Sequence, residues 1–181
     1  MRKIILPIFI IVSGVFAVSA QSKAPKTVRD YFLLLPAKYF STDCCGEKTT
    51  RATKEKYLKQ YLDVEDTANG YMKAYGDGAQ EAFEMALFKK PDGSYLIGFY
   101  TIGEGDPEDV PYTRFLQYKA GTWTDVSKTV MTGYAPKTRI YQLPRQGTTV
   151  EVFQKDEAAS DFGKGKKLHD LVWKNGRFTV K

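Results

Sequence analysis

The fold is decided by residues 81–102, which read EAFEMALFKKPDGSYLIGFYTI. On the first arm Phe83, Met85 and Leu87 alternate with smaller or polar residues, and this period of two puts one set of side chains on one face of a strand. In the second arm, residues 95–102, both alternating sets of side chains contain apolar groups. This is typical of a strand that packs on both faces. Because Pro91-Asp92-Gly93 separates the arms, the segment predicts an antiparallel hairpin at the centre of the fold.

Turn signals recur at short intervals after this hairpin, which favours an antiparallel meander over alternating strands and helices. Three of the turns share a pattern in which an aromatic residue and a lysine precede the turn, and a glycine and an aromatic residue follow it. They occupy residues 88–95, 118–123 and 173–178. Aromatic pairs across antiparallel strands help to fix the register, so the pattern predicts recurrent hairpins. The spacing of the turns is unequal, which argues against repeated modules.

Two short helices are predicted before the strands. Thr27 is placed to cap a helix in which Asp30 stands at the third position, and Pro36 would end that helix. A second helix is expected over residues 50–62, where apolar residues recur at helical spacing opposite charged ones. The predicted fold is α+β, with these helices packed on a twisted antiparallel β-meander of about seven to nine strands that could curl into a half-barrel.

The N-terminus has the pattern of a secretory signal. Basic residues at positions 2 and 3 precede an apolar run over residues 4–20, with small residues at a cleavage site after Ala20. We expect a signal peptide over 1–20, a flexible lead-in over 21–26 and a single domain over 27–181, in a secreted or periplasmic protein without a membrane span. The alternative is an uncleaved anchor, but the run is shorter than the roughly 20 residues that span a bilayer.

The charge is mildly basic. The chain has 27 lysines and arginines and 21 aspartates and glutamates, a net charge of +6. Loss of Arg2 and Lys3 with the signal would leave 25 basic and 21 acidic residues, or +4. The basic residues are scattered, so ordinary solubility explains them, and export argues against nucleic acid as a partner.

Residues for the common catalytic mechanisms are scarce. The one histidine, His169, stands next to Asp170 on a predicted strand, where neighbouring side chains point to opposite faces and cannot form an orienting pair. No nucleophile elbow, phosphate-binding loop, zinc-protease motif or EF-hand occurs in the sequence. The sequence therefore favours a protein that is not an enzyme and that carries no cofactor.

Cys44 and Cys45 are the most unusual pair in the chain. Cysteines of exported proteins usually form disulfides, but a bond between neighbours closes no loop and adds little stability. Four functional interpretations remain open: a strained vicinal disulfide, a soft-metal site, an intermolecular bridge, or a nucleophile served by His169. The simpler interpretation is a pair of small thiols in a loop.

Two further features are candidate binding sites. Acidic residues between 104 and 109 could hold calcium, but their spacing matches no known loop and a solvated turn explains them better. Aromatic and basic residues interleave at Tyr112, Arg114, Tyr118 and Trp123, a composition suited to stacking on a peptide or glycan.

The leading hypothesis is therefore an exported, non-enzymatic binding domain of a bacterial-type cell envelope, whose ligand is a protein, peptide or glycan. The alternative is a thiol-dependent redox or soft-metal-handling protein that uses Cys44 and Cys45.

Overall fold

The computed structural model describes residues 24–42, 48–76, 81–102, 113–156 and 163–181. These residues form three helices and ten strands. The helices are α1 (Val28–Leu34), α2 (Arg51–Tyr61) and α3 (Ser127–Val130). The strands are β1 (Leu62–Asp66), β2 (Tyr71–Ala74), β3 (Ala82–Lys89), β4 (Tyr95–Ile102), β5 (Thr113–Lys119), β6 (Thr122–Asp125), β7 (Arg139–Gln142), β8 (Thr149–Lys155), β9 (Lys164–Lys174) and β10 (Arg177–Val180).

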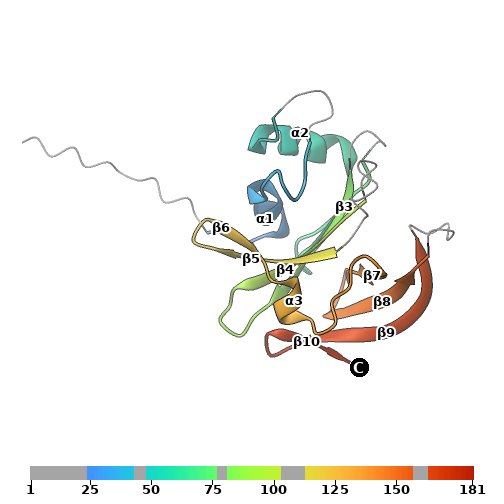
Figure 1. Cartoon of the computed structure of the whole chain (residues 1–181). Helices are drawn as coiled ribbons and strands as arrows, with labels where there is room; N and C mark the ends of the chain where they lie inside the picture. Colours follow the sequence, from blue (N-terminus) through green and yellow to red (C-terminus); the bar gives the residue numbers. More distant parts are fainter. Residues whose placement is uncertain (1–23, 43–47, 77–80, 103–112, 157–162) are drawn as a thin grey trace, which may run out of the picture.

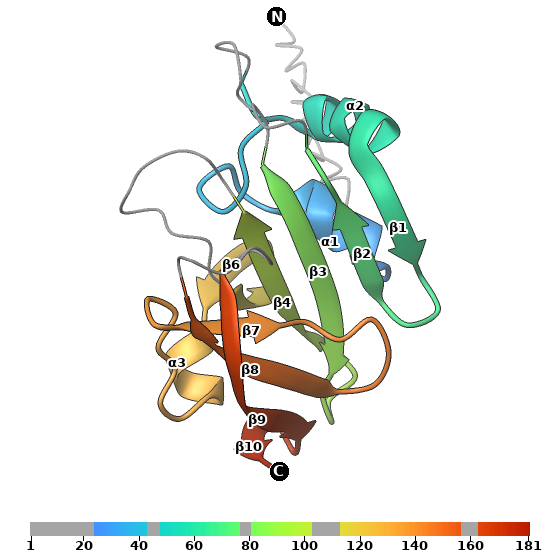
Figure 2. The same cartoon turned by 90° about the vertical axis from the view of Figure 1, so that its right-hand side faces the viewer.

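The strands form two antiparallel sheets. Sheet A has six strands in the order β1-β2-β3-β4-β5-β6, and sheet B has four in the order β10-β9-β8-β7. In Figure 2 the strands β7 and β8 of sheet B cross over the strands of sheet A at a steep angle. The predicted α+β class is compatible with this structure, which is mostly antiparallel sheet with few helices. The prediction of one meander of seven to nine strands is wrong, because the chain leaves sheet A after β6 and starts a second sheet at β7.

Sheet A is the middle of three layers, with α1 and α2 on one face and sheet B on the other (Figure 1). Each interface has its own apolar core. The helix-side core is built from Val28, Tyr31, Phe32, Leu33, Leu35, Phe40, Tyr57, Leu58, Met72, Ala74, Phe83, Met85, Ile97, Phe99, Leu116 and Trp123. The core between the sheets is built from Tyr71, Ala86, Phe88, Leu96, Tyr100, Phe115, Met131, Tyr141, Leu143, Val150, Val152, Leu171, Trp173 and Phe178.

Strand β4 contributes to both cores, as its sequence predicted. Ile97 and Phe99 point to the helix side, whereas Leu96 and Tyr100 point to sheet B. The strand pairs with β3 on one side and with β5 on the other. The two-sided hydrophobic pattern of β4 therefore has a direct cause in the three-layer architecture.

The helices begin where the sequence provides caps. The Thr27 side chain accepts a hydrogen bond from the backbone N–H of Asp30, and the Asp30 carboxylate accepts one from the backbone N–H of Thr27. Thr50 and Thr53 form the same reciprocal arrangement at the start of α2. Each box satisfies N–H groups that have no partner inside the helix, so the start of each helix is fixed locally.

Two of the recurrent hairpins place their aromatic residues directly opposite each other. Tyr118 pairs with Trp123 and Trp173 pairs with Phe178, with ring centroids 5.2 and 5.0 Å apart. Their turns are two residues long, and both residues of each turn have positive φ, at 49° and 83° in one and 52° and 83° in the other. In the longer hairpin between β3 and β4, the shared pattern would place Phe88 opposite Tyr95. The observed register is shifted by one position, so Phe88 lies opposite Leu96.

The two tryptophans of these hairpins also connect the layers. The indole N–H of Trp123 donates to the Leu34 carbonyl at 3.0 Å, which joins sheet A to the end of α1. The indole N–H of Trp173 donates to the Lys89 carbonyl at 2.9 Å, which joins sheet B to the β3–β4 hairpin. Each tryptophan therefore combines apolar packing with a polar contact to the next layer.

The sequence did not predict β1 or α3. β1 follows α2 without a loop, and its Asp63, Glu65 and Asp66 gave no strand pattern. It is nevertheless held by pairing with β2 and by an ion pair of 2.5 Å between Glu65 and Arg29 of α1. Within the described residues, no helix combines the length and the apolar character that crossing a membrane would require.

Close contact between the sheets depends on the absence of a side chain at Gly98. A Cβ atom placed on this residue would lie 2.7 Å from Cδ2 of Leu143 and 3.1 Å from Cε2 of Phe88. Leu143 follows β7 and is 4% exposed, so its side chain occupies the space above the glycine. Sheet B can therefore approach sheet A at this point only because residue 98 has no Cβ.

We expect Gly98→Val to lower the free energy of unfolding by about 1–3 kcal/mol, because the added methyl groups must displace Leu143 or Phe88. Chemical denaturation measures the change. Leu143→Ala removes the principal clashing group, so in the Leu143→Ala background the same valine should cost much less. An equal cost in both backgrounds would contradict the proposed contact.

Lys54 of α2 is a buried amine between the two helices. It is 3% exposed, and its Nζ donates to the Leu35 carbonyl and, at 3.2 Å, to the Phe32 carbonyl at the C-terminal end of α1. Burial lowers the pKa of Lys54 to about 8. The lysine adds a donor to carbonyls at the end of α1, where the Phe32 carbonyl also accepts the Leu35 N–H, but its charged form is costly to bury.

The contribution of Lys54 to stability should therefore increase with pH. Between the folded pKa of about 8 and the unfolded value of about 10.4 the unfolded chain binds more protons, so rising pH favours the folded state. We expect the difference in unfolding free energy between the wild type and Lys54→Met to grow by about 2 kcal/mol from pH 7.5 to 10. Lys59→Met, at an exposed position of the same helix, is the control. If the difference in unfolding free energy between the wild type and Lys54→Met did not change with pH, the lowered pKa of Lys54 would be contradicted.

Candidate functional site

A cleft lies between sheet A and strand β7 of sheet B, and we call it the inter-sheet cleft. Its volume is about 250 Å³. Sheet A contributes residues of β2, β3 and β4, and sheet B contributes β7 and the start of β9. The lining residues are Lys73, Ala74, Tyr75, Ala82, Phe83, Glu84, Tyr100, Ile140, Tyr141, Gln142 and Lys164. A cleft of this size suits one side chain or one sugar ring better than a larger ligand.

A row of polar side chains crosses sheet A along the floor of the cleft. Lys73 lies opposite Glu84, and Glu84 lies opposite Tyr100, so strand register places all three on one face. Lys73 Nζ is 3.3 Å from Glu84 Oε1, and both side chains are largely shielded from water. Lys73 Nζ also lies 4.9 Å from the ring centroid of Tyr75, a cation–π contact at the exposed side of the cleft.

The Glu84 carboxylate also perturbs two neighbouring groups. Burial raises the pKa of Tyr71, and the negative charge of Glu84 together with its hydrogen bond to the phenol raises this pKa further. Burial alone would lower the pKa of Lys73, but the charge and hydrogen bond of Glu84, with smaller contributions from Tyr75 and Asp63, together outweigh burial and the net pKa is raised. Glu84 is therefore the centre of a polar cluster that raises the pKa of both Tyr71 and Lys73.

Strand β7 forms the opposite wall and is fixed at one end. It is an edge strand of sheet B, paired with β8 on one side. On its other side the Tyr141 carbonyl accepts a hydrogen bond of 2.6 Å from Oγ1 of Thr113. Thr113 is the residue of β5 that lies opposite Tyr100, so it extends the row of Lys73, Glu84 and Tyr100 across sheet A. The Tyr141 hydroxyl in turn accepts a bond of 2.8 Å from the Ala135 N–H. The sheets are therefore joined at Thr113, and the cleft extends from that side towards β2.

The cleft offers binding chemistry of mixed character. Two ammonium groups, a carboxylate, three phenols and the Gln142 carboxamide provide both donors and acceptors, and Ile140 and Ala82 provide apolar contact. Within the part of the chain that the structure describes, no group of three or more His, Cys, Asp or Glu residues is placed to hold a metal ion.

Three of the four residues predicted to bind ligand lie on one face of sheet A, the face covered by α1. Trp123 is 9% exposed, and the ring of Tyr31 lies 6.3 Å from Trp123 and 6.2 Å from Tyr118, in edge-to-face geometry. Arg114 lies over the Tyr39 ring at 5.9 Å. Their described contacts are therefore internal to the protein. Tyr112 lies outside the described residues, and a ligand-binding role for the four residues stays a prediction.

The other sequence candidates do not meet at one place. His169 lies opposite Val152, and Asp170 lies opposite Glu151. Lys167 bridges the two carboxylates, at 2.8 Å from Asp170 and 2.5 Å from Glu151. Asp170 is thus engaged with Lys167 on sheet B. Cys44, Cys45 and the acidic segment 104–109 lie outside the described residues, so the predictions that concern them stay open.

Sequence reasoning did not select the cleft residues. Glu84 stands among apolar residues in the first arm of the central hairpin. A carboxylate in such a strand is a usable signal of a buried polar cluster. Lys73 and Tyr100 gave no comparable signal, because each is ordinary in its own segment. Their proximity follows from the register of three strands, which the sequence does not specify.

Comparisons with protein-family models, with curated proteins and with solved structures gave no match for this chain. The inter-sheet cleft is therefore interpreted from its own geometry.

The polar row provides a quantitative test of the floor of the cleft. In a double-mutant cycle with Lys73→Met and Glu84→Gln, we expect a coupling energy of about 1 kcal/mol, because a partly shielded pair interacts more strongly than an exposed one. Chemical denaturation of the four proteins measures the coupling. The exposed pair Arg51 and Glu55 on α2, joined at 3.0 Å, is the control. Coupling no larger than in that pair would contradict the proposed shielding.

Proposed function

We propose that this protein is an exported, non-enzymatic binding domain of a bacterial-type cell envelope, and that it holds one protruding group of a protein, peptide or glycan in the inter-sheet cleft. The observation that carries the proposal is the polar row of Lys73, Glu84 and Tyr100 at the floor of a cleft between two packed sheets. The predicted signal segment supports export, and the size of the cleft supports a single side chain or sugar ring as the bound group.

The chemistry of the cleft favours binding over catalysis. Glu84 already accepts a hydrogen bond from Tyr71 and lies 3.3 Å from Lys73, so the side chains of Glu84 and Lys73 are held in fixed positions. Such groups position a ligand through hydrogen bonds without having to change their protonation state. We therefore propose that these fixed donors and acceptors recognise a polar group.

The thiol-dependent alternative concerns Cys44 and Cys45 and rests on the sequence alone. Intact mass measured with and without reductant and a thiol-blocking reagent distinguishes it from the binding proposal. Free, unreactive thiols without bound metal would remove its support.

The binding proposal is tested with fragments that resemble one protruding group. A panel of N-acetyl amino acid amides and methyl glycosides is titrated into the labelled protein and followed by amide NMR shifts. We expect at least one class to shift the amides of Glu84, Tyr100 and Gln142, with dissociation constants on the order of 1 mM for such small ligands.

A substitution that fills the cleft provides the matched comparison. Ala82 lines the cleft, so Ala82→Trp should abolish the shifts, whereas Ala52→Trp at an exposed position of α2 should leave them unchanged. Fragments that bind only elsewhere, or that still bind the Ala82→Trp protein equally well, would refute the cleft as the binding site.

A further inference from the structure

A second concave surface lies on sheet B and differs in chemistry from the cleft. It has a volume of about 430 Å³. We call it the basic groove, and it is lined by Lys137, Thr138, Arg139, Gln154, Lys155 and Leu168. The groove and the cleft share no lining residue. They are nevertheless adjacent, because Arg139 and Ile140 are neighbours on β7 and line one surface each.

All ionisable side chains among these lining residues are basic. Lys137 is exposed, and Arg139 and Lys155 are half-buried. One of the five N–H donors of Arg139 is used by the Gly133 carbonyl at 3.3 Å, which orients the guanidinium group. Together these three side chains present cationic hydrogen-bond donors to one concavity, which favours a ligand with several negative groups.

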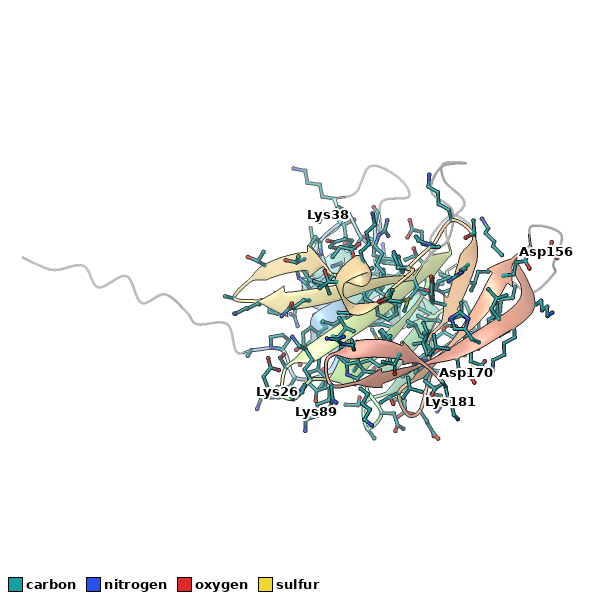
Figure 3. The ribbon with its side chains drawn as sticks, turned by 60° about the horizontal axis from the view of Figure 1, so that its bottom comes forward. Lys26, Lys38, Lys89, Asp156, Asp170 and Lys181 are labelled. Atoms are coloured by element: carbon teal, nitrogen blue, oxygen red, sulfur yellow. The ribbon has the colours of Figure 1, made fainter. Side chains whose placement is uncertain are left out.

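The strand pairing next to the groove places two lysines opposite each other. Lys155 lies directly opposite Lys164 in the β8–β9 ladder, and like charges in opposite positions destabilise a sheet. The nearest carboxylate along the described strand, Asp156, packs against Gly165, where an added Cβ would lie 2.9 Å from the Asp156 Cβ. Figure 3 shows Asp156 beside the start of β9, at the end of sheet B remote from Asp170 and Lys181.

The groove also has an apolar side chain within the basic surface. Leu168 lines it and is 43% exposed, one of the few large apolar residues that reach solvent in the described structure. A sulfated glycan or a nucleic acid backbone has no aliphatic group to cover a leucine. A peptide segment can combine carboxylates with an aliphatic side chain in one ligand.

We infer that the basic groove binds an acidic peptide segment of a partner protein, with carboxylates on Lys137, Arg139 and Lys155 and one apolar side chain on Leu168. The inference does not depend on the function proposed for the cleft. Binding should weaken as salt is added, because the groove is open and its charges are partly exposed.

The test uses the mature chain and a fluorescent peptide in which aspartates and glutamates flank one leucine. Three comparison probes separate the contributions: a peptide with asparagine and glutamine in place of the acids, an acidic peptide with serine in place of leucine, and a heparin oligosaccharide of similar charge. We expect the acidic, leucine-containing peptide to bind most tightly in fluorescence anisotropy. We also expect the uncharged peptide to show no binding.

Two pairs of substitutions remove the same charge at different places. Lys137→Gln with Lys155→Gln should weaken binding about tenfold, because two charge-assisted contacts are lost. Lys56→Gln with Lys59→Gln, at exposed positions of α2, should have little effect. Leu168→Ser should remove the preference for leucine over serine in the peptide while acid-dependent binding remains.

Three results would overturn the inference. Equal loss of binding in both double variants would show attraction by net charge alone. Heparin binding as tightly as the peptide, with no effect of Leu168→Ser, would show a general polyanion site. Absence of binding to the acidic, leucine-containing peptide at low salt would show that the groove does not recognise acidic segments.

Discussion

The architecture depends on burial of both faces of sheet A. Helices on one face and a second sheet on the other remove most of the large apolar side chains of β3 and β4 from water, and this burial is the dominant favourable term in folding. The arrangement is possible because Gly98 leaves room for Leu143 at the point of closest approach. Two residues before Leu143, the Tyr141 carbonyl of β7 accepts a hydrogen bond from Thr113 of sheet A. The inter-sheet cleft is lined by the same part of β7.

Local features of the sequence predicted local structure well. The alternation in residues 81–102, the capping pair Thr27 and Asp30, and the recurrent turn at residues 173–178 each act over a few residues, so each could be interpreted without the rest of the chain. The division into two sheets could not be predicted in this way. It depends on contacts such as Leu143 over Gly98 and Trp173 with Lys89, which join segments far apart in sequence.

The candidate site follows the same division. The aromatic residues that the sequence emphasised, Tyr118 and Trp123, pack under α1, because a hairpin rich in aromatic residues also provides the largest apolar surface for a helix to cover. The cleft residues are individually unremarkable and become a site only through the register of β2, β3 and β4. Strand β7 contributes to both concave surfaces, the inter-sheet cleft with its mixed charges and the basic groove. The two surfaces therefore suit ligands of different chemistry.

The position of β7 also affects self-association. An edge strand normally exposes unpaired backbone groups to which a strand of another molecule can add. The unpaired side of β7 instead faces sheet A, where Thr113 occupies the Tyr141 carbonyl. Other edge strands are short or charged: β6 and β10 have four residues each, and β1 carries three acidic side chains. The fold that creates the cleft therefore also limits the growth of β-aggregates from its sheet edges.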